Sequence, residues 1–432
     1  MPNAYQVPHL KTALKGPLLE LEQHLLSHSQ AIECWFRQQF RQTPAPFYAS
    51  VDLRNAGYKL APVDTNLFPA GFNNLHPDLR PLAVQAAQNA ITQACPITDG
   101  VLIIPENHTR NMFYLENVCT LKEIIENAGY DVQIGSLNPE VTATSQIDLP
   151  SGRTLTLKPL IRQGERVGVE NFFPCAVLLN NDLSAGRPPI LENIEQVLLP
   201  PLDLGWSTRY KTQHFNHYSD VTREFSQLID IDPWLITPES VQCGPIDFKE
   251  RIGLENLAET VNKVLENTAN YYHEHDIDCK PFVIIKSDSG TYGMAIMSVK
   301  NADDVLNLNR KQRTKMTSAK EGLAVDKMLV QEGVYTFETV DDAVAEPVVY
   351  MIHNHVIGGF YRIHTGKTAT DNLNSPGMHF EPMSFQQSGV LPDQTQAPDA
   401  EPNRFYAYGV VARLALLAAA REIQSARDKM KA

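Results

Sequence analysis

The 432-residue sequence lacks several features that mark common classes of protein. It has no surplus of positive charge, since 37 Lys and Arg stand against 50 Asp and Glu; the net charge of −13 argues against a protein that wraps nucleic acid or lies on an anionic membrane. Residues 1–17 contain no apolar core of a secretory signal. The most apolar window, residues 410–420, is interrupted by Arg413 and is too short to cross a bilayer.

Cysteine is scarce and dispersed. The six cysteines include no C-x-x-C pair and indicate no zinc site. This pattern favours free thiols in a reducing compartment, most of them in the core, and we therefore expect a cytoplasmic protein. The residues concerned are Cys34, Cys95, Cys119, Cys175, Cys243 and Cys279.

Two well-known phosphate-binding motifs, G-x-x-x-x-G-K-[ST] and G-x-G-x-x-G, are also absent. Residues 281–294, PFVIIKSDSGTYGM, nevertheless combine an apolar run with a turn of small residues. The run ends at Lys286 and predicts a buried strand. The two glycines that follow permit a sharp turn whose backbone amides can approach an anion. We interpret this segment as a nucleotide-phosphate loop; a strand-to-strand turn without a ligand is the alternative.

The first half of the chain has the alternating pattern of an open α/β sheet. Residues 101–105, 115–127 and 131–134 predict a strand, a helix and a second strand. Ligands of such sheets bind beyond the carboxyl ends of the strands. The polar residues expected there are Glu106, His108, Arg110 and Asn111.

Two further segments combine cationic and aromatic residues. Residues 47–75 are rich in Asn and Asp, which capped turns explain, but the interleaved Arg54 and Lys59 favour a pocket for a small zwitterion or carboxylate. Residues 205–215 place three basic side chains beside two aromatic ones, a pattern that suits either an anionic substrate or a solvated face. These basic residues are Arg209, Lys211 and His214.

The second half of the chain begins after a proline-rich boundary at residues 232–247. Asp247 is predicted to cap an amphipathic helix. Residues 345–365 predict a hairpin with Glu346 on the entering strand and Arg362 on the returning strand. Residues 370–378 then concentrate side-chain oxygens before a Pro-Gly turn.

These segments, in this order, resemble a known family. VDTNLFPAGFNNL, KSDSGTYGMAIMSV, AEPVVYMI…GGFYRI and NLNSPGM are similar to the proteobacterial, ATP-grasp-like form of glutamate–cysteine ligase (gamma-glutamylcysteine synthetase), over about residues 20–427. The resemblance implies an α/β (α+β) fold, a glutathione-synthetase-like ATP-grasp with an N-terminal open α/β substrate domain. The implied domains are residues 1–240 for the substrate domain, 241–333 for the central or lid subdomain, and 334–432 for the C-terminal subdomain.

The resemblance also implies an activity and its cofactors. ATP, with Mg²⁺, would phosphorylate the γ-carboxylate of glutamate, and the amine of cysteine would attack the acyl phosphate to give γ-glutamylcysteine, the first step of glutathione biosynthesis. The expected partners are these small molecules, with no nucleic acid and no membrane, and homo-oligomerisation is left open. The alternatives are another ATP-grasp carboxylate–amine ligase and a non-catalytic nucleotide-binding regulatory protein.

Site residues follow from the same resemblance. Those implied for ATP are Lys249, Lys286, Ser289, Gly290, Thr291, Gly293, Gln331, Glu332 and Val334. Those implied for the metal are Glu346, Asn372 and Asn374, and those for the glutamate substrate are Arg54, Lys59, Asn66, Asn74 and Arg110. Arg362 and Lys286 are expected to stabilise the transferred phosphoryl group.

The last metal motif departs from the ATP-grasp pattern. That pattern has Glu-x-Asn, whereas residues 372–374 read Asn-Leu-Asn, with Asp371 one place earlier. Either Asp371 reaches the metal or Glu346 carries the charge. Glu346 could instead form a purely structural ion pair with Arg362 across the hairpin.

Overall fold

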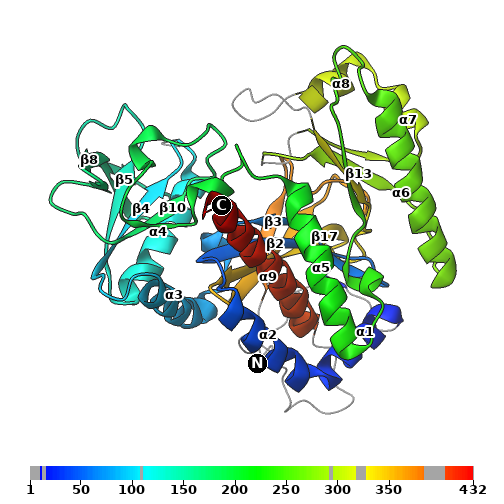
Figure 1. The fold of residues 1–432 in the computed structure, drawn as a ribbon, viewed down its shortest axis with the longest axis horizontal. Helices are drawn as coiled ribbons and strands as arrows, with labels where there is room; N and C mark the ends of the chain where they lie inside the picture. The colour runs from blue at the N-terminus through cyan, green and yellow to red at the C-terminus, as the bar shows by residue number, and fades with distance from the viewer. Residues whose placement is uncertain are drawn as a thin grey trace.

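The computed structural model describes residues 10–11, 16–107, 110–290, 295–317, 327–383 and 404–431. Its helices and strands form three larger sheets with their covering helices, and a separate two-stranded hairpin (Figure 1). The six-stranded sheet lies on one side of the molecule, the four-stranded sheet lies on the other, and the seven-stranded sheet lies between them. The mixed α/β class predicted from the sequence is confirmed.

The central seven-stranded sheet joins distant parts of the chain by antiparallel pairing. The hairpin of β17 and β18 is the one predicted over residues 345–365, and β2 pairs with the other edge of β17. β3 extends the sheet beyond β2. The strands are β1 (Leu10–Lys11), β2 (Tyr48–Asn55), β3 (Leu60–Asn66), β16 (Thr339–Val340), β17 (Ala343–Ile352), β18 (His355–His364) and β19 (His379–Met383).

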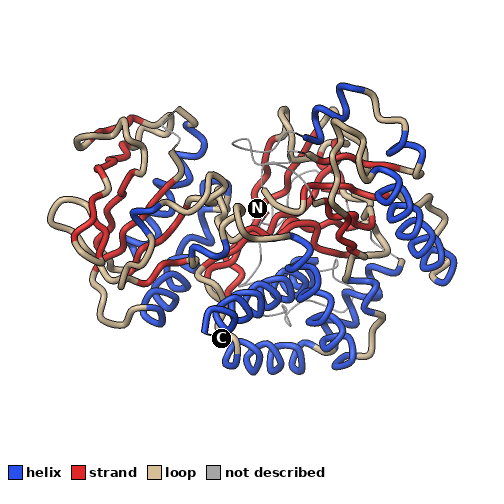
Figure 2. The backbone as a smooth tube through the Cα atoms, turned by 45° about the horizontal axis from the view of Figure 1, so that its top comes forward, coloured by secondary structure: helices blue, strands red, loops and turns tan. Residues whose placement is uncertain are grey.

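A group of helices covers one face of this sheet (Figure 2). The last helix, α9, contacts β2, β3 and β17, and its Ala and Leu residues are almost entirely buried. Arg413 of α9 is buried as well, and it forms two 2.7 Å bonds to the carboxylate of Glu33. The helices are α1 (Pro17–Ser27), α2 (Ser29–Gln42), α5 (Lys211–Ile229) and α9 (Arg404–Lys431).

The six-stranded sheet is parallel except at the β6–β7 pair. The strand–helix–strand unit predicted from residue 101 onward is present as β4, α4 and β5. The elements are β4 (Gly100–Pro105), β5 (Asp131–Ser136), β6 (Ser145–Asp148), β7 (Thr154–Pro159), β10 (Ala176–Asn180), β11 (Val197–Leu199), α3 (Arg80–Ala94) and α4 (Met112–Asn127), with the separate hairpin β8 (Ile161–Gln163) and β9 (Arg166–Gly168).

Two cysteines of this region form a disulfide, which corrects the prediction that all six are free thiols. Cys95, at the end of α3, is bonded to Cys175, just before β10. The two Cα atoms lie 6.4 Å apart, within the range that a disulfide allows. The two cysteines are 80 residues apart, so no local spacing in the sequence indicates this disulfide. The parallel packing of the α/β unit brings them together.

The four-stranded sheet is antiparallel throughout and packs against α6. The helix predicted to start at Asp247 starts at Leu254, because residues 247–252 form a turn closed by an isolated bridge. Lys249 therefore lies in the turn and not in the helix. The elements are β12 (Ser240–Cys243), β13 (Val283–Ser287), β14 (Ile296–Val299), β15 (Met328–Glu332), α6 (Leu254–Glu274), α7 (Asp303–Leu306) and α8 (Arg310–Thr317).

Short 3₁₀ helices connect these elements, at η1 (Phe72–Asn74), η2 (Pro77–Leu79), η3 (Pro189–Leu191), η4 (Leu202–Leu204) and η5 (Pro233–Ile236). Within the described residues, no helix combines the length and the apolar character needed to span a bilayer. The division of the chain at residues 240 and 333 stays a prediction.

Candidate active site

A cleft of about 810 Å³ lies between the seven-stranded and four-stranded sheets, and the start of α4 and Asp182 after β10 also line it. This volume suits a ligand of cofactor size. Its floor is one face of the seven-stranded sheet, since alternate residues of a strand point to the same side. The floor residues are Ser50, Asp52 and Arg54 of β2, Asp64 and Asn66 of β3, Glu346, Val348 and Tyr350 of β17, and Phe360 and Arg362 of β18.

A network of ion pairs crosses this floor. Arg362 lies opposite Glu346 in the β17–β18 register, and its Nη1 donates to Glu346 Oε1 at 2.6 Å and to Asp52 Oδ2 at 2.7 Å. Arg54 Nε donates to the other oxygen of Glu346 at 3.1 Å. The cross-hairpin ion pair considered from the sequence is therefore present, and both oxygens of Glu346 are bound to arginines.

Two members of the network, Asp52 and Arg362, have shifted pKa values. Burial raises the pKa of Asp52, against the opposing charge of Arg362. Burial also opposes the charge of Arg362, but the carboxylates of Asp52 and Glu346 outweigh it and hold the pKa of the guanidinium above its usual value. Arg362 is thus a fixed cation within the cleft.

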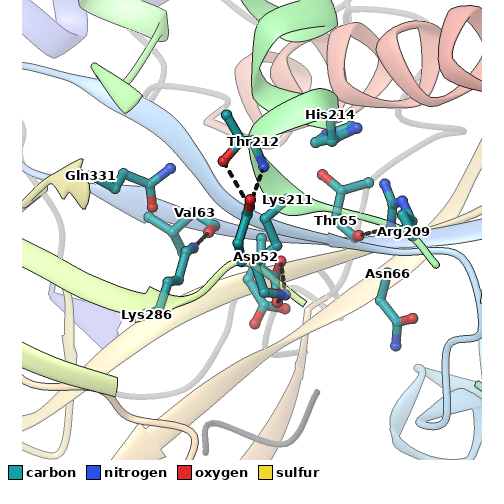
Figure 3. Close-up of polar contacts among 12 residues, drawn as sticks. Asp52, Val63, Thr65, Asn66, Arg209, Lys211, Thr212, His214, Lys286 and Gln331 are labelled. Atoms are coloured by element: carbon teal, nitrogen blue, oxygen red, sulfur yellow. Dashed lines mark hydrogen bonds and ion pairs between the residues drawn. The ribbon is translucent and has the colours of Figure 1, made fainter. Parts of the chain in front are cut away.

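Lys286 supplies a cation from the opposite wall. It lies on β13 and is buried, and its Nζ donates to the carbonyl oxygen of Val63 at 2.5 Å (Figure 3). Burial lowers the pKa of Lys286 from 10.5 to about 8, with Asp64 opposing the shift and Lys211 adding to it. Other residues of the same wall are Ile284, Ile296 and Gln331.

Lys59 does not reach the cleft. Its side chain is fully buried, and its ammonium lies 2.8 and 2.7 Å from the two carboxylate oxygens of Glu332. The ammonium also lies 4.1 Å from the centroid of the Trp234 ring. The Glu332 carboxylate accepts the backbone amide of Glu239 as well, so it is held by the protein and is not available to a ligand. This pair joins β15 to the loop between β2 and β3.

The other sequence-predicted residues divide into two groups. Those that line the cleft are Asn66, Asn74, Gly290, Gln331, Glu332, Val334, Asn372 and Asn374. Ser289, Arg110 and Lys249 do not line it, and the side chain of Lys249 is 83% exposed. Thr291, Gly293 and His108 lie outside the described residues.

The candidate metal ligands form a small set of oxygen donors on the cleft. Asp371 is not among them, because its carboxylate accepts the amide and hydroxyl of Thr368 and does not line the cleft. The side-chain oxygen of Asn372 accepts the amide of Asn374, and both residues line the cleft with Glu346. Within the described part of the chain, no group of three or more His, Cys, Asp or Glu residues is placed to hold a metal ion.

Several cleft residues were not predicted from the sequence. Asp52 stands between Ser50 and Arg54 with the period of two expected of a strand, a signal that could have identified it. Lys211 was seen only as part of a basic cluster, and nothing local placed it beside Asp64. Asp288, in the loop just after β13, does not line the cleft, because its carboxylate is fully buried and binds Thr212.

Comparisons with known proteins were made for the whole chain. The model of the family described as glutamate-cysteine ligase matches residues 22–423. A crystal structure of a protein assigned as a gamma-glutamylcysteine synthetase from Methylobacillus flagellatus KT is 57% identical, covers 97% of this chain and 99% of its own, and has a TM-score of 0.90. A comparison with curated proteins found no significant match.

Two other solved structures are much more distant. A glutathione synthetase-like effector from Globodera pallida is 9% identical, with 84% of this chain and 81% of its own covered and a TM-score of 0.36. D-alanyl-alanine synthetase A from Vibrio cholerae is also 9% identical, with 74% and 82% covered and a TM-score of 0.33. Similarities this low carry no inference about this chain.

The buried Lys59–Glu332 pair yields a stability prediction. Replacing Lys59 by Met leaves the buried Glu332 carboxylate without its cation, and we expect the free energy of unfolding to fall by about 3–5 kcal/mol. The measurement is urea unfolding, with the exposed Lys300→Met as the matched control. Adding Glu332→Gln to Lys59→Met should recover part of the loss. If the free energy of unfolding of Lys59→Met lies within about 1 kcal/mol of the wild-type value, the structural role given to this pair is contradicted.

Proposed function

Because the chain belongs to the glutamate–cysteine ligase family, we propose that its cleft uses ATP to activate the γ-carboxylate of glutamate and then joins it to the amine of cysteine. The observation that supports this most directly is that two cations, Lys286 on one wall and Arg362 on the floor, line the same cleft. Two cations that face one space suit a reaction in which phosphate charge develops between them.

The reaction consists of two displacements. In the first, a γ-carboxylate oxygen of glutamate attacks the terminal phosphorus of ATP, the bond to the bridging oxygen breaks, and ADP leaves. In the second, the cysteine amine attacks the carbonyl carbon of the acyl phosphate, phosphate leaves, and the nitrogen loses a proton. Lys286 and Arg362 stabilise the phosphoryl oxygens, and the surrounding walls restrict access of water to the acyl phosphate.

The nucleotide is proposed to lie along the four-stranded sheet. Gln331, Glu332 and Val334 border the cleft there, and the Glu332 carboxylate is already bound to Lys59, so backbone groups of this segment would meet the base. Ser289 and the glycines that follow are proposed to cover the phosphates. Lys249 would join them only after a movement, because it lies outside the cleft in this structure.

A magnesium ion fits the chemistry of the donors on the cleft. Glu346, Asn372 and Asn374 offer oxygen atoms, and Mg²⁺ is held in many phosphoryl-transfer enzymes by one or two carboxylates with substrate phosphates and water. When bound, the ion would neutralise charge on the terminal phosphates. Arg54 and Arg362 bind the two oxygens of the Glu346 carboxylate in this structure, so a bound ion would have to share or displace these contacts.

Glutamate is proposed to bind at the end of the cleft away from the four-stranded sheet. Asn66 and Asn74 line the cleft and can meet the α-carboxylate and the α-amine. Arg54 lines the cleft too, but its nitrogens donate to Glu346 and to the carbonyl oxygens of Val334 and Asp371, so it would reach glutamate only by giving up one of these contacts. Lys59 and Arg110 do not line it, so these two have no role in this proposal. A reaction that consumes ATP and free amino acids is also consistent with the cytoplasm as the proposed location.

The requirement for substrates tests the activity. We expect the protein to release ADP from ATP and Mg²⁺ when glutamate and cysteine are both present, and to release little with ATP alone or with either amino acid alone. The measurement is a coupled ADP assay over a panel of amino acids and dipeptides. Turnover only with another carboxylate and amine would indicate a different ligase, and the absence of turnover with every pair would indicate a non-catalytic nucleotide-binding protein.

Removal of the Lys286 ammonium tests the proposed phosphate site. Lys286→Ala should lower kcat/KM for ATP at least about tenfold, because one cation is lost from the transition state. Steady-state kinetics would measure this, with Lys263→Ala on the exposed face of α6 as the control. Wild-type kinetics in Lys286→Ala would remove this residue from the mechanism.

The lowered pKa of Lys286 predicts a pH dependence of ATP binding. Phosphate binds the protonated ammonium, so above about pH 7, where the terminal phosphate of ATP is fully ionised, the affinity for ATP should decline as pH rises through the Lys286 pKa of about 8, approaching tenfold per pH unit. Calorimetric titration with ATP alone measures this affinity without interference from the ionisation of the amino-acid substrates. Lys286→Arg keeps its charge in this range and should lack the decline; equal pH profiles for the two proteins would contradict the assignment.

A further inference from the structure

Lys211 is a second buried ammonium on the wall of the cleft. It is the first residue of α5, and its Nζ lies 3.0 and 3.2 Å from the two carboxylate oxygens of Asp64. The same ammonium lies 3.8 Å from the centroid of the Trp206 ring, where the aromatic face attracts a cation. Lys211, Trp206 and Asp64 all line the cleft, so this charge borders the space that a ligand would fill.

Lys211 and Lys286 bind neighbouring residues of β3, since Lys211 pairs with the Asp64 carboxylate and the Lys286 ammonium donates to the carbonyl oxygen of Val63. In agreement with this placement, the charge of Asp64 raises the pKa of Lys286 and the charge of Lys211 lowers it. The next carboxylate on the floor, Asp52, is bound to Arg362. Asp64, whose side chain is 37% exposed, is thus the contacting partner of Lys211, whereas Lys286 contacts a backbone carbonyl, and an anion in the cleft can approach both ammonium groups.

Asp288 fixes Lys211 relative to the strand that carries Lys286. The Asp288 carboxylate is fully buried, and its Oδ1 accepts the amide and the hydroxyl of Thr212, both at 2.7 Å. Its carbonyl oxygen accepts the amide of Lys211 at 2.7 Å. Tyr210 provides no capping side chain to α5, so Asp288 caps this helix from the loop after β13. The placement of the two lysines is therefore linked through the backbone.

We propose that Lys211 and Lys286 bind one anionic oxygen group of a substrate together, and that this anion replaces Asp64 as the partner of Lys211. The group is a phosphate of ATP or a carboxylate of glutamate, which share the negative oxygens that an ammonium recognises. The proposal rests on the proposed function for the identity of these ligands. It adds Lys211 as a binding residue and gives Asp64 the role of holding the Lys211 ammonium in the free protein.

The test compares Lys211→Met, which keeps most of the apolar stem and removes the charge, with Lys211→Arg, which keeps the charge. If the anion is a phosphate, we expect Lys211→Met to lower kcat/KM for ATP at least about tenfold. If the anion is a carboxylate, we expect the same loss in kcat/KM for glutamate. Lys211→Arg should recover part of the loss. Lys263→Met on the exposed face of α6 is the matched control and should behave as wild type.

Binding measurements separate this proposal from the proposed function. Calorimetric titration with ATP and with glutamate reports the contact without turnover, so a loss of affinity for either ligand in Lys211→Met supports the proposal even in a protein that lacks ligase activity. Unchanged affinity for both ligands overturns it, whether or not the wild type is active.

Asp64→Asn provides an independent variant should Lys211→Met fail to fold. It leaves Lys211 in place and removes the carboxylate that competes with the incoming anion. We expect the affinity for that ligand to equal or exceed that of the wild type. Weaker binding of both ATP and glutamate by Asp64→Asn would overturn the proposal.

Discussion

The antiparallel pairing of β2 with β17 is the interaction on which the cleft depends. Arg54 and Glu346 are 292 residues apart in the sequence, and this register brings them into contact on one face of the sheet. Because side chains alternate along a strand, a slip of one residue would turn Asp52 and Arg54 towards the opposite face, which α9 covers. The charged floor exists only in this register.

The floor concentrates charge within an acidic protein. Buried ion pairs gain little net stability, since the loss of hydration offsets much of the attraction. In the proposed reaction, the contacts of Arg362 with Asp52 and Glu346 would act as preorganisation, in which a cation is held in position before a phosphate arrives. The family's reaction needs such a cation. In a chain with a net charge of −13, local contacts with carboxylates hold the cation in position.

Two buried carboxylates connect the four-stranded sheet to the rest of the site. Glu332 of β15 binds Lys59, which stands just before β3, and Asp288 after β13 binds the first turn of α5. Both contacts cross from one sheet or helix group to another. They help to place the wall that carries Lys286 over the floor of the cleft.

The sequence by itself determined the features that depend on local pattern. Apolar periodicity identified the strand that ends at Lys286, the β17–β18 hairpin and the strand–helix–strand unit, and the order of these segments indicated the family. Those predictions hold because hydrogen bonding within a helix or hairpin is decided by nearby residues.

Only the tertiary structure decided which charged side chains share a space. It directed Lys59 to Glu332, left Lys249 in an exposed turn, added Asp52 and Lys211 to the cleft, and joined Cys95 to Cys175. A lysine in a polar segment has the same local pattern whether it faces a ligand, a buried carboxylate or water. The choice among these follows from strand register and packing between segments far apart in the chain, which local periodicity does not encode.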